Sequence, residues 1–232
     1  MNKYAKSGVA HTVALAEAML QSSLHKSNEE FRTSLHGEIC ETVLEILILD
    51  YMRVHKKDTE SWILKKGLIL QDPENKESDY LTEVDLSLFT PQKIFVFECK
   101  SYAGNKIICD KCTIKRDKGI FDVYKQNEAH GIVMHKNLEA FRLYKPETAG
   151  LKDLQLVLFD FSLGSCKDVR GEAFKRLMPC TNKENVLLLF RNLQVEPVLW
   201  KMIGVSKAVE IIAKASIKNR SKHLKYVKQL KH

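Results

Sequence analysis

The sequence predicts a mixed α/β domain in which a central sheet is flanked by helices. Two observations support this class. Runs with helical spacing of apolar residues precede and follow a group of short β-rich runs. The middle runs are joined by short turns, as in an antiparallel meander. The expected order is helix, β-meander, helix, strand, strand and helix, which packs a sheet against helices.

Helices are expected near both ends of the chain and in its second half. An Ala/Leu-rich run predicts a helix over Val9–Leu24. Ser27-Asn28-Glu29-Glu30 has the spacing of a capping box, and apolar residues three and four positions apart predict the helix that it opens, ending near Tyr51-Met52. The same spacing predicts helices over Asn127–Tyr144, ended by Pro146, and from Ser206 on.

Strands are expected where β-formers gather. The stretch Thr82–Gly104 holds two apolar runs joined by Thr90-Pro91-Gln92-Lys93, which predicts an antiparallel hairpin with a short turn. The polar segment Gln71–Tyr80 before it is expected to be a loop. The other expected strands are Ile63–Leu70, a short hairpin of Lys106–Ile108 and Thr113–Lys115 around Asp110-Lys111, Leu154–Phe161, and Val186–Phe190.

Length and charge suggest how the chain is divided. The 232 residues fit one domain with extensions, and we expect an N-terminal helical extension over 1–30, an α/β domain over 31–200 and a basic C-terminal helical tail over 201–232. The net charge is +8, and all of it lies in the tail, because the first 200 residues balance to zero. Val209, Ile212, Ala213 and Ile217 are expected to be the buried side of the tail's helix.

Composition also bears on location. No run of 18 apolar residues exists, so no membrane span is expected. The N-terminal stretch is interrupted by His11, Thr12 and Glu17 and does not resemble a signal peptide. Six scattered cysteines without framework spacing are then most simply reduced thiols, and the sequence favours a cytoplasmic protein.

The central hairpin carries the residues with the clearest chemical meaning. Asp85 lies in its first run, and Glu98-Cys99-Lys100 ends the second. Alternation along a strand places Glu98 and Lys100 on one face, and burying unpaired charge is costly. Mg²⁺ prefers oxygen ligands, which Asp85, Glu98 and the Cys99 carbonyl would supply. Lys100 would position water or neutralise the phosphate, so the hairpin favours phosphodiester hydrolysis with Mg²⁺ or Mn²⁺.

Two further residues are candidates for the same site. Glu38 sits between Leu35 and Ile39, near the helix's apolar stripe and not opposite it, so its carboxylate could point at the sheet and provide a further acid. Gln126, at the start of the later helix, is expected to orient Lys100 or substrate. His130 lies one turn beyond Gln126 and could line the site, but such a histidine is more often a helix-surface residue, and it is left out of the catalytic set.

These residues, in this order, resemble the nuclease-related domain (NERD) family of the PD-(D/E)xK restriction-endonuclease-like superfamily. The resemblance covers about Phe31–Phe161, and the Cys-x-x-Cys pair at Cys109 departs from the family's pattern. It implies a restriction-endonuclease-like central mixed sheet, Asp85 and Glu98 as metal ligands, Lys100 as a catalytic residue, and Glu38 and Gln126 as accessory residues. The matching features are Gly37-Glu38, Glu83-Val84-Asp85, Phe97-Glu98-Cys99-Lys100, Tyr102, Gly104, Gln126-Asn127 and His130.

Simpler interpretations stand beside these. Glu98 and Lys100 would also suit an ion pair that protects an edge strand. Glu38 alone would suit a solvated helix position, and Gln126 a helix cap. Cys109 and Cys112 have the spacing of a zinc knuckle, but four ligands are needed, and Cys166 and Cys180 complete the set only if the fold brings them near.

The leading hypothesis is a metal-dependent nuclease that acts on DNA. The basic tail is expected to contact phosphates, or else to be a solvated face. An RNA target and a catalytically silent nucleic-acid-binding or signalling module on the same fold are the alternatives. The residues expected to contact nucleic acid are Lys218, Arg220, Lys222, Lys225 and Lys228.

Overall fold

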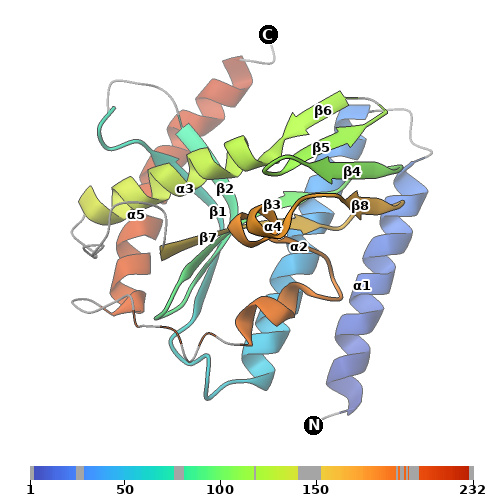
Figure 1. The fold of residues 1–232 in the computed structure, drawn as a ribbon. Helices are drawn as coiled ribbons and strands as arrows, with labels where there is room; N and C mark the ends of the chain where they lie inside the picture. Colours follow the sequence, from blue (N-terminus) through green and yellow to red (C-terminus); the bar gives the residue numbers. More distant parts are fainter. Residues whose placement is uncertain are drawn as a thin grey trace. The chain divides into compact units, whose positions relative to one another are not determined.

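The computed structural model shows the helices and strands in Figure 1. It describes residues 3–24, 29–75, 81–117, 119–140, 153–191, 193, 196, 198 and 204–229, with the backbone alone for 3–7, 29–32 and 221–229. Its helices are α1 (Lys3–Ser23), α2 (Glu29–Val54), α3 (Val123–Ala140), α4 (Glu172–Leu177), the 3-10 helix η2 (Val186–Phe190) and α5 (Val205–Gln229).

The strands form two sheets. One has five strands in the order β1-β2-β3-β7-β9, and the other has four in the order β6-β5-β4-β8. Both sheets mix antiparallel and parallel pairs, which confirms the mixed α/β class. The strands are β1 (Ile63–Gln71), β2 (Leu81–Phe89), β3 (Ile94–Lys100), β4 (Lys106–Cys109), β5 (Thr113–Arg116), β6 (Gly119–Asp122), β7 (Leu154–Asp160), β8 (Cys166–Asp168) and β9 (Cys180–Thr181).

The chain divides into two compact units. Unit 1 is 1–58, 98–124 and 157–191, and unit 2 is 59–97, 125–156 and 192–232. Strand β3 runs from unit 2 into unit 1, since its first four residues belong to one and Glu98–Lys100 to the other. The predicted domain boundaries near residues 30 and 200 do not coincide with the limits of these units, and they stay a prediction.

In unit 1, α1 and α2 lie side by side (Figure 1). Ser23 Oγ and His36 Nε2 are 2.6 Å apart and link the two helices through a buried hydrogen bond. The buried face of α2 is centred on Cys40, Leu44 and Ile48, all of which are fully buried. Cys40 Sγ also donates to the carbonyl of Lys100 at 3.4 Å, so α2 is anchored to the end of β3.

In unit 2, β1, β2 and β3 form the predicted antiparallel meander. The β2–β3 turn closes as expected, because Thr90 N donates to the Lys93 carbonyl at 3.0 Å. Helix α5 docks on β1: Ile69 N donates to Ser216 Oγ at 2.8 Å, and Asn219 Nδ2 donates to the Ile69 carbonyl at 3.2 Å. The first half of the basic helix is therefore held against the sheet.

One position in the β1–β2 register lacks a ladder pair. Lys66 pairs with Leu86 and Leu68 with Val84, so Gly67 stands at the position opposite Asp85. Gly67 has φ of 61°, a left-handed conformation that glycine adopts without a side-chain clash. A glycine inside a strand marks a local irregularity, and here it falls beside a predicted site residue.

Several expectations are corrected. Val186–Phe190 is a 3-10 helix, because Asn182 Oδ1 accepts from the backbone of Glu184 and Asn185 and starts a turn. Ile217 is 73% exposed, so the buried side of α5 ends at Ser216. Four short elements were not predicted from the sequence: β6, β8, α4 and β9. Two predicted helix signals, Ser27 and Pro146, lie outside the described residues.

Candidate active site

Glu98 and Lys100 form an ion pair at the end of β3. Lys100 Nζ lies 2.5 Å from Glu98 Oε1, and the Glu98 side chain is 1% exposed against 20% for Lys100. The prediction that these side chains share a face is confirmed. Because β3 lies between β2 and β7 in the sheet order, the alternative that the pair protects an edge strand is wrong.

The surroundings of the Glu98 carboxyl disfavour its ionised form. Burial raises the pKa of its carboxyl, because low-dielectric surroundings disfavour the ionised form. The charge and hydrogen bond of Lys100 lower that pKa, and the negative charge of Glu41 raises it again. Burial outweighs the lysine, so the pKa stays above its ordinary value. An additional cation beside this carboxyl would favour its ionised form.

Glu41, which the sequence analysis missed, is the α2 carboxylate whose charge reaches Glu98. It is half-buried and directly follows Cys40, which is hydrogen-bonded to the end of β3. Glu38 is exposed on the same helix, although it was expected to point at the sheet. The predicted stripe residues Ile39, Val43 and Leu47 are buried, but the buried face is centred on Cys40 and Leu44, so Glu38 lies outside it. An accessory role for Glu38 stays a prediction.

The other predicted residues lie in unit 2. Asp85 is half-buried on β2 and directly precedes Leu86, which pairs with Phe97. Gln126 is exposed on α3. Its neighbour Asn127 is fully buried and donates from Nδ2 to the Val96 carbonyl at 3.0 Å, so it docks α3 on β3.

His130 was expected on the surface of the α3 helix, and this expectation is wrong. The residue is 7% exposed. It lies three residues after Asn127, the fully buried amide that docks on β3, and residues three apart share a helix face. The buried face of α3 therefore includes His130.

The segment after Lys100 is fixed by a second loop, which follows β7. Phe161 N donates to the Lys100 carbonyl at 3.0 Å, and Tyr102 N donates to Ser162 Oγ at 2.7 Å. Gly164 has φ of 95°, and a Cβ atom there would lie 2.5 Å from the Gly104 carbonyl oxygen. The two loops approach so closely that only glycine fits. Lys100 is therefore held by backbone contacts on a rigid support.

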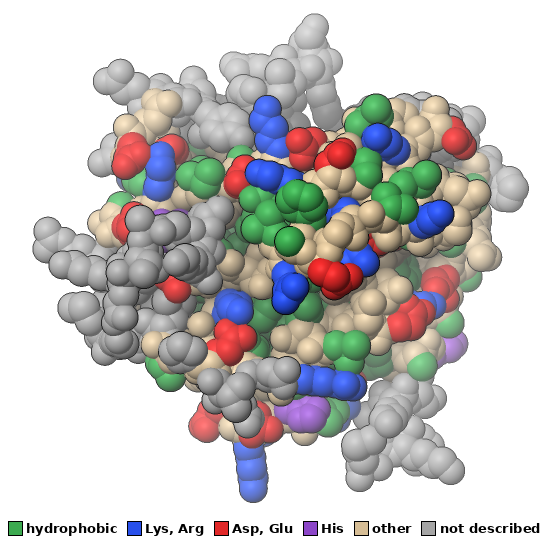
Figure 2. Space-filling model, viewed as in Figure 1, with side chains coloured by type: hydrophobic (Ala, Val, Ile, Leu, Met, Phe, Trp, Pro, Cys, Tyr) green, Lys and Arg blue, Asp and Glu red, His purple; other side chains and the backbone are tan. Residues whose placement is uncertain are grey.

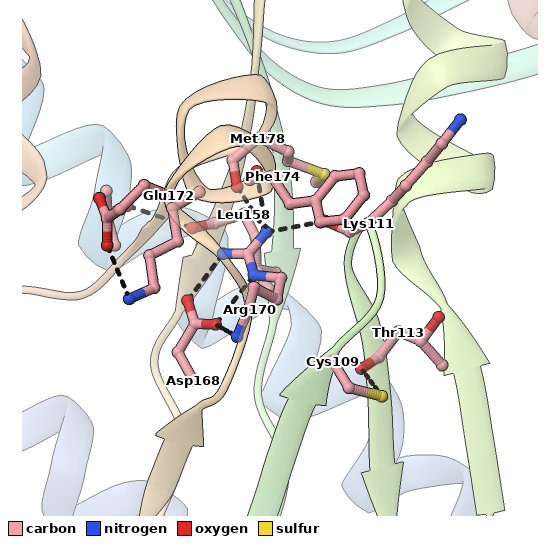
Figure 3. Close-up of polar contacts among 11 residues, drawn as sticks. Cys109, Lys111, Thr113, Leu158, Asp168, Arg170, Glu172, Phe174 and Met178 are labelled. Atoms are coloured by element: carbon pink, nitrogen blue, oxygen red, sulfur yellow. Dashed lines mark hydrogen bonds and ion pairs between the residues drawn. The ribbon is translucent and has the colours of Figure 1, made fainter.

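Arg170 joins three segments around the four-stranded sheet, as Figure 3 shows. Its side chain is fully buried and forms a two-pronged contact with Asp168, Nε to Oδ1 at 2.9 Å and Nη2 to Oδ2 at 2.8 Å. Its Nη1 donates to the carbonyls of Lys111 at 2.9 Å and Met178 at 2.8 Å. The guanidinium therefore ties the β4–β5 turn to the end of α4, and this role is structural.

All six cysteines are free thiols. Cys109 and Cys112 flank the β4–β5 turn, as expected. A hydrogen bond joins the side chains of Cys166 and Cys180 and lowers the pKa of the Cys166 thiol. Among the described residues, no group of three or more His, Cys, Asp or Glu side chains is placed to hold a metal ion, so zinc gains no support.

The expected nucleic-acid contacts lie on α5. Lys218 and Arg220 are exposed. The side chains of Lys222, Lys225 and Lys228 lie outside the described residues, although the helix itself continues to Gln229. None of the described helices is long and apolar enough to cross a membrane.

Together, the mixed sheet flanked by helices and the buried Glu-x-Lys pair on an interior strand define a restriction-endonuclease-like α/β protein. The family model described as the nuclease-related domain matches residues 41–156, half of the chain. The chain belongs to the nuclease-related domain family, as the resemblance implied. Neither a curated protein nor a solved structure gives a significant match.

Proposed function

We propose that this protein is a metal-dependent nuclease that hydrolyses phosphodiester bonds in DNA. The observation that carries the proposal is the Glu98–Lys100 pair, which is buried on an interior strand and lies in the field of Glu41. Charged groups buried with a perturbed pKa are typical of functional sites. Membership of the nuclease-related domain family supports the same class of reaction.

The donor groups suit a hard divalent cation. Glu98 and Glu41 supply two carboxylates, and the Cys99 carbonyl follows Glu98 directly on β3. Mg²⁺ is commonly held by one or two carboxylates and keeps several waters, so a cage of three protein side chains is not required. A cation there would offset both the burial of Glu98 and its repulsion by Glu41.

We further propose that Asp85 belongs to the same site. In the chain, Asp85 directly precedes Leu86 on β2 and Glu98 directly follows Phe97 on β3, and Leu86 pairs with Phe97. This order of acidic residues is the one that the resemblance to the nuclease-related domain family implies for metal ligands. On β1, Asp85 stands opposite Gly67, which has no side chain.

Each residue then has a distinct task. A bound Mg²⁺ or Mn²⁺ would supply a water of lowered pKa and a positive charge for the phosphate. Glu98 and Glu41 would hold this charge in place, and the ammonium of Lys100 would offset the negative charge that develops on the phosphate oxygens during in-line attack. Lys218 and Arg220 contact phosphates of the DNA away from the cleaved bond. With its free thiols, we place the protein in the cytoplasm.

Cleavage of labelled DNA and RNA in Mg²⁺, Mn²⁺ or EDTA tests the proposal. Glu98→Gln and Lys100→Met should each abolish metal-dependent cleavage. The exposed Glu172–Lys175 pair on α4, with a separation of 3.2 Å, provides matched controls in Glu172→Gln and Lys175→Met, which should retain activity. Nucleic-acid binding without cleavage by the wild-type protein would favour the silent binding module. Cleavage of RNA alone would correct the substrate.

A further inference from the structure

Three side chains stack beside the catalytic lysine in unit 1. The rings of Tyr102 and Phe121 are 5.6 Å apart, centroid to centroid, and inclined by 25°. The Arg116 guanidinium carbon lies 4.3 Å from the Tyr102 centroid and 5.7 Å from that of Phe121. These distances are those of offset aromatic stacking and of a cation–π contact.

Phe121 presents this stack to solvent. Ile108, Ile114 and Phe121 stand side by side across β4, β5 and β6, and their exposed fractions are 0%, 1% and 40%. The row therefore leaves the core at Phe121, because β6 is an edge strand of its sheet. Its neighbour Ile120 is 69% exposed. Figure 2 shows hydrophobic and basic side chains next to one another over this part of the surface.

The stack is continuous with the candidate active site. Tyr102 is two residues from Lys100, and its backbone is pinned to Ser162. Burial raises the pKa of the Tyr102 hydroxyl, and the charges of Lys100, Arg116 and Glu98 all act on it as well. Within the described part of the chain, Arg116 forms no ion pair, so its charge is available to an anionic ligand.

We propose that Tyr102, Arg116 and Phe121 form a subsite that stacks an unpaired base of the substrate next to the cleaved phosphate. An aromatic face accepts any base, but the bases of a duplex are already stacked on one another. Only a single strand, or a base displaced from a duplex, offers a free face to Phe121. Arg116 would contact the adjoining phosphate. The inference rests on the proposed nuclease function and names its substrate class as single-stranded DNA.

Binding measured in EDTA separates this subsite from catalysis. Fluorescence anisotropy with a short single-stranded oligodeoxynucleotide should give a Kd that rises about five- to a hundredfold in Phe121→Ala, the range measured for loss of one stacked base. Phe121→Leu keeps an apolar side chain but removes the aromatic face, and it should weaken binding similarly. Phe174→Ala on α4 is the matched control, since Phe174 is 41% exposed, and its Kd should not change.

Two further measurements sharpen the test. The indole introduced by Phe121→Trp should retain affinity, and stacking should change its fluorescence on adding the single strand. Arg116→Gln should reduce the slope of log K against log salt by about 0.7, the value for one phosphate contact on a single strand. A blunt duplex of the same sequence should bind Phe121→Ala and wild type equally.

The outcomes are separable from those of the nuclease proposal. Hydrolysis of bis(p-nitrophenyl) phosphate with Mn²⁺ needs no stacked base, so its absence in the wild-type protein would count against the nuclease alone. The subsite is overturned if the wild type does not bind the single strand, or if Phe121→Leu binds it as tightly as the wild type. A loss of duplex binding equal to the loss of single-strand binding would overturn the substrate class.

Discussion

Replacing Lys100 by methionine tests whether Glu98 and Lys100 carry opposite charges in the folded protein. The substitution Lys100→Met keeps most of the side-chain volume but leaves the Glu98 carboxylate, 1% exposed, without its 2.5 Å partner. Removing one member of a buried pair costs about 3–5 kcal/mol, because the remaining charge is not compensated. Lys100 is 20% exposed, which favours the lower end of that range.

Protonation sets an upper limit on this cost. An isolated buried carboxyl can take up a proton, at about 1.4 kcal/mol for each pH unit above its ordinary pKa. With that ordinary value at 4.5, the limit is about 3 kcal/mol at pH 7 and below about 1 kcal/mol at pH 5. Because the pKa of Glu98 is raised even beside Lys100, we expect Lys100→Met to lose less than about 3 kcal/mol of unfolding free energy at pH 7, and much less at pH 5.

The sign of this pH dependence follows from the raised pKa of Glu98. Between the ordinary carboxyl pKa and the raised one, the unfolded chain has released its proton while the folded protein still holds it. The free energy of unfolding therefore falls as the pH rises through this window and is level above it. Lys100→Met removes the main influence that lowers the pKa of Glu98, so the fall should extend to higher pH.

Urea unfolding in EDTA at pH 5 and pH 7 measures both effects. The double variant Glu98→Gln/Lys100→Met removes both charges and should recover most of the stability lost at pH 7. The exposed pair gives the reference, since Lys175→Met should cost no more than about 1 kcal/mol. A loss below about 1 kcal/mol for Lys100→Met, with no change between the two pH values, would show that Glu98 holds its proton even beside Lys100. This outcome would refute the ion pair between Glu98 and Lys100.

Four other predictions concern the same molecule. Asp85→Ala and Glu98→Ala should each abolish cleavage while the far-UV circular dichroism spectrum is retained, and full activity in both would refute the site. Mg²⁺ should raise the melting temperature more at pH 8 than at pH 6, because the cation competes with a proton for Glu98, and Glu98→Gln should lose this difference. Gly164→Ala should cost at least about 2 kcal/mol in urea unfolding, from its φ of 95° and the contact with the Gly104 carbonyl, whereas Gly171→Ala, where a Cβ meets nothing within 4 Å, should be nearly neutral. Lys218→Gln/Arg220→Gln should lower the slope of log K against log salt on duplex DNA by up to about 2, and an unchanged slope would make α5 a solvated face.

The central hairpin could be predicted because its signals are local. Alternation fixes which residues share a face, and a glutamate and a lysine at the end of Ile-Phe-Val-Phe stand out in any strand. Helix α2 was also predicted, together with part of its buried face, since Ile39, Val43 and Leu47 are buried. Cys40 and His36 are buried there through contacts with Lys100 and Ser23, which are distant in sequence, so Glu41 was missed in favour of Glu38.

Other elements depend on contacts that the sequence does not display. The run Val186–Phe190 is too short for its apolar residues to distinguish a strand from a helical turn, and the Asn182 side chain decides between them. Strand β6 is four residues long and is defined by its pairing with β5. The buried Arg170 takes its carbonyl partners from Lys111 and Met178, which no spacing rule connects to it.

The same long-range contacts explain how the candidate site is held in position. The Lys100 carbonyl accepts from Cys40 Sγ on α2 and from Phe161 N after β7, so two segments meet the end of β3 at one atom. The helix that supplies Glu41 and the loop that fixes Tyr102 are thereby tied to the strand that supplies Glu98 and Lys100. Groups that must stabilise charge in a transition state act best when their supports do not have to rearrange. Catalysis and single-strand binding would therefore share one rigid support.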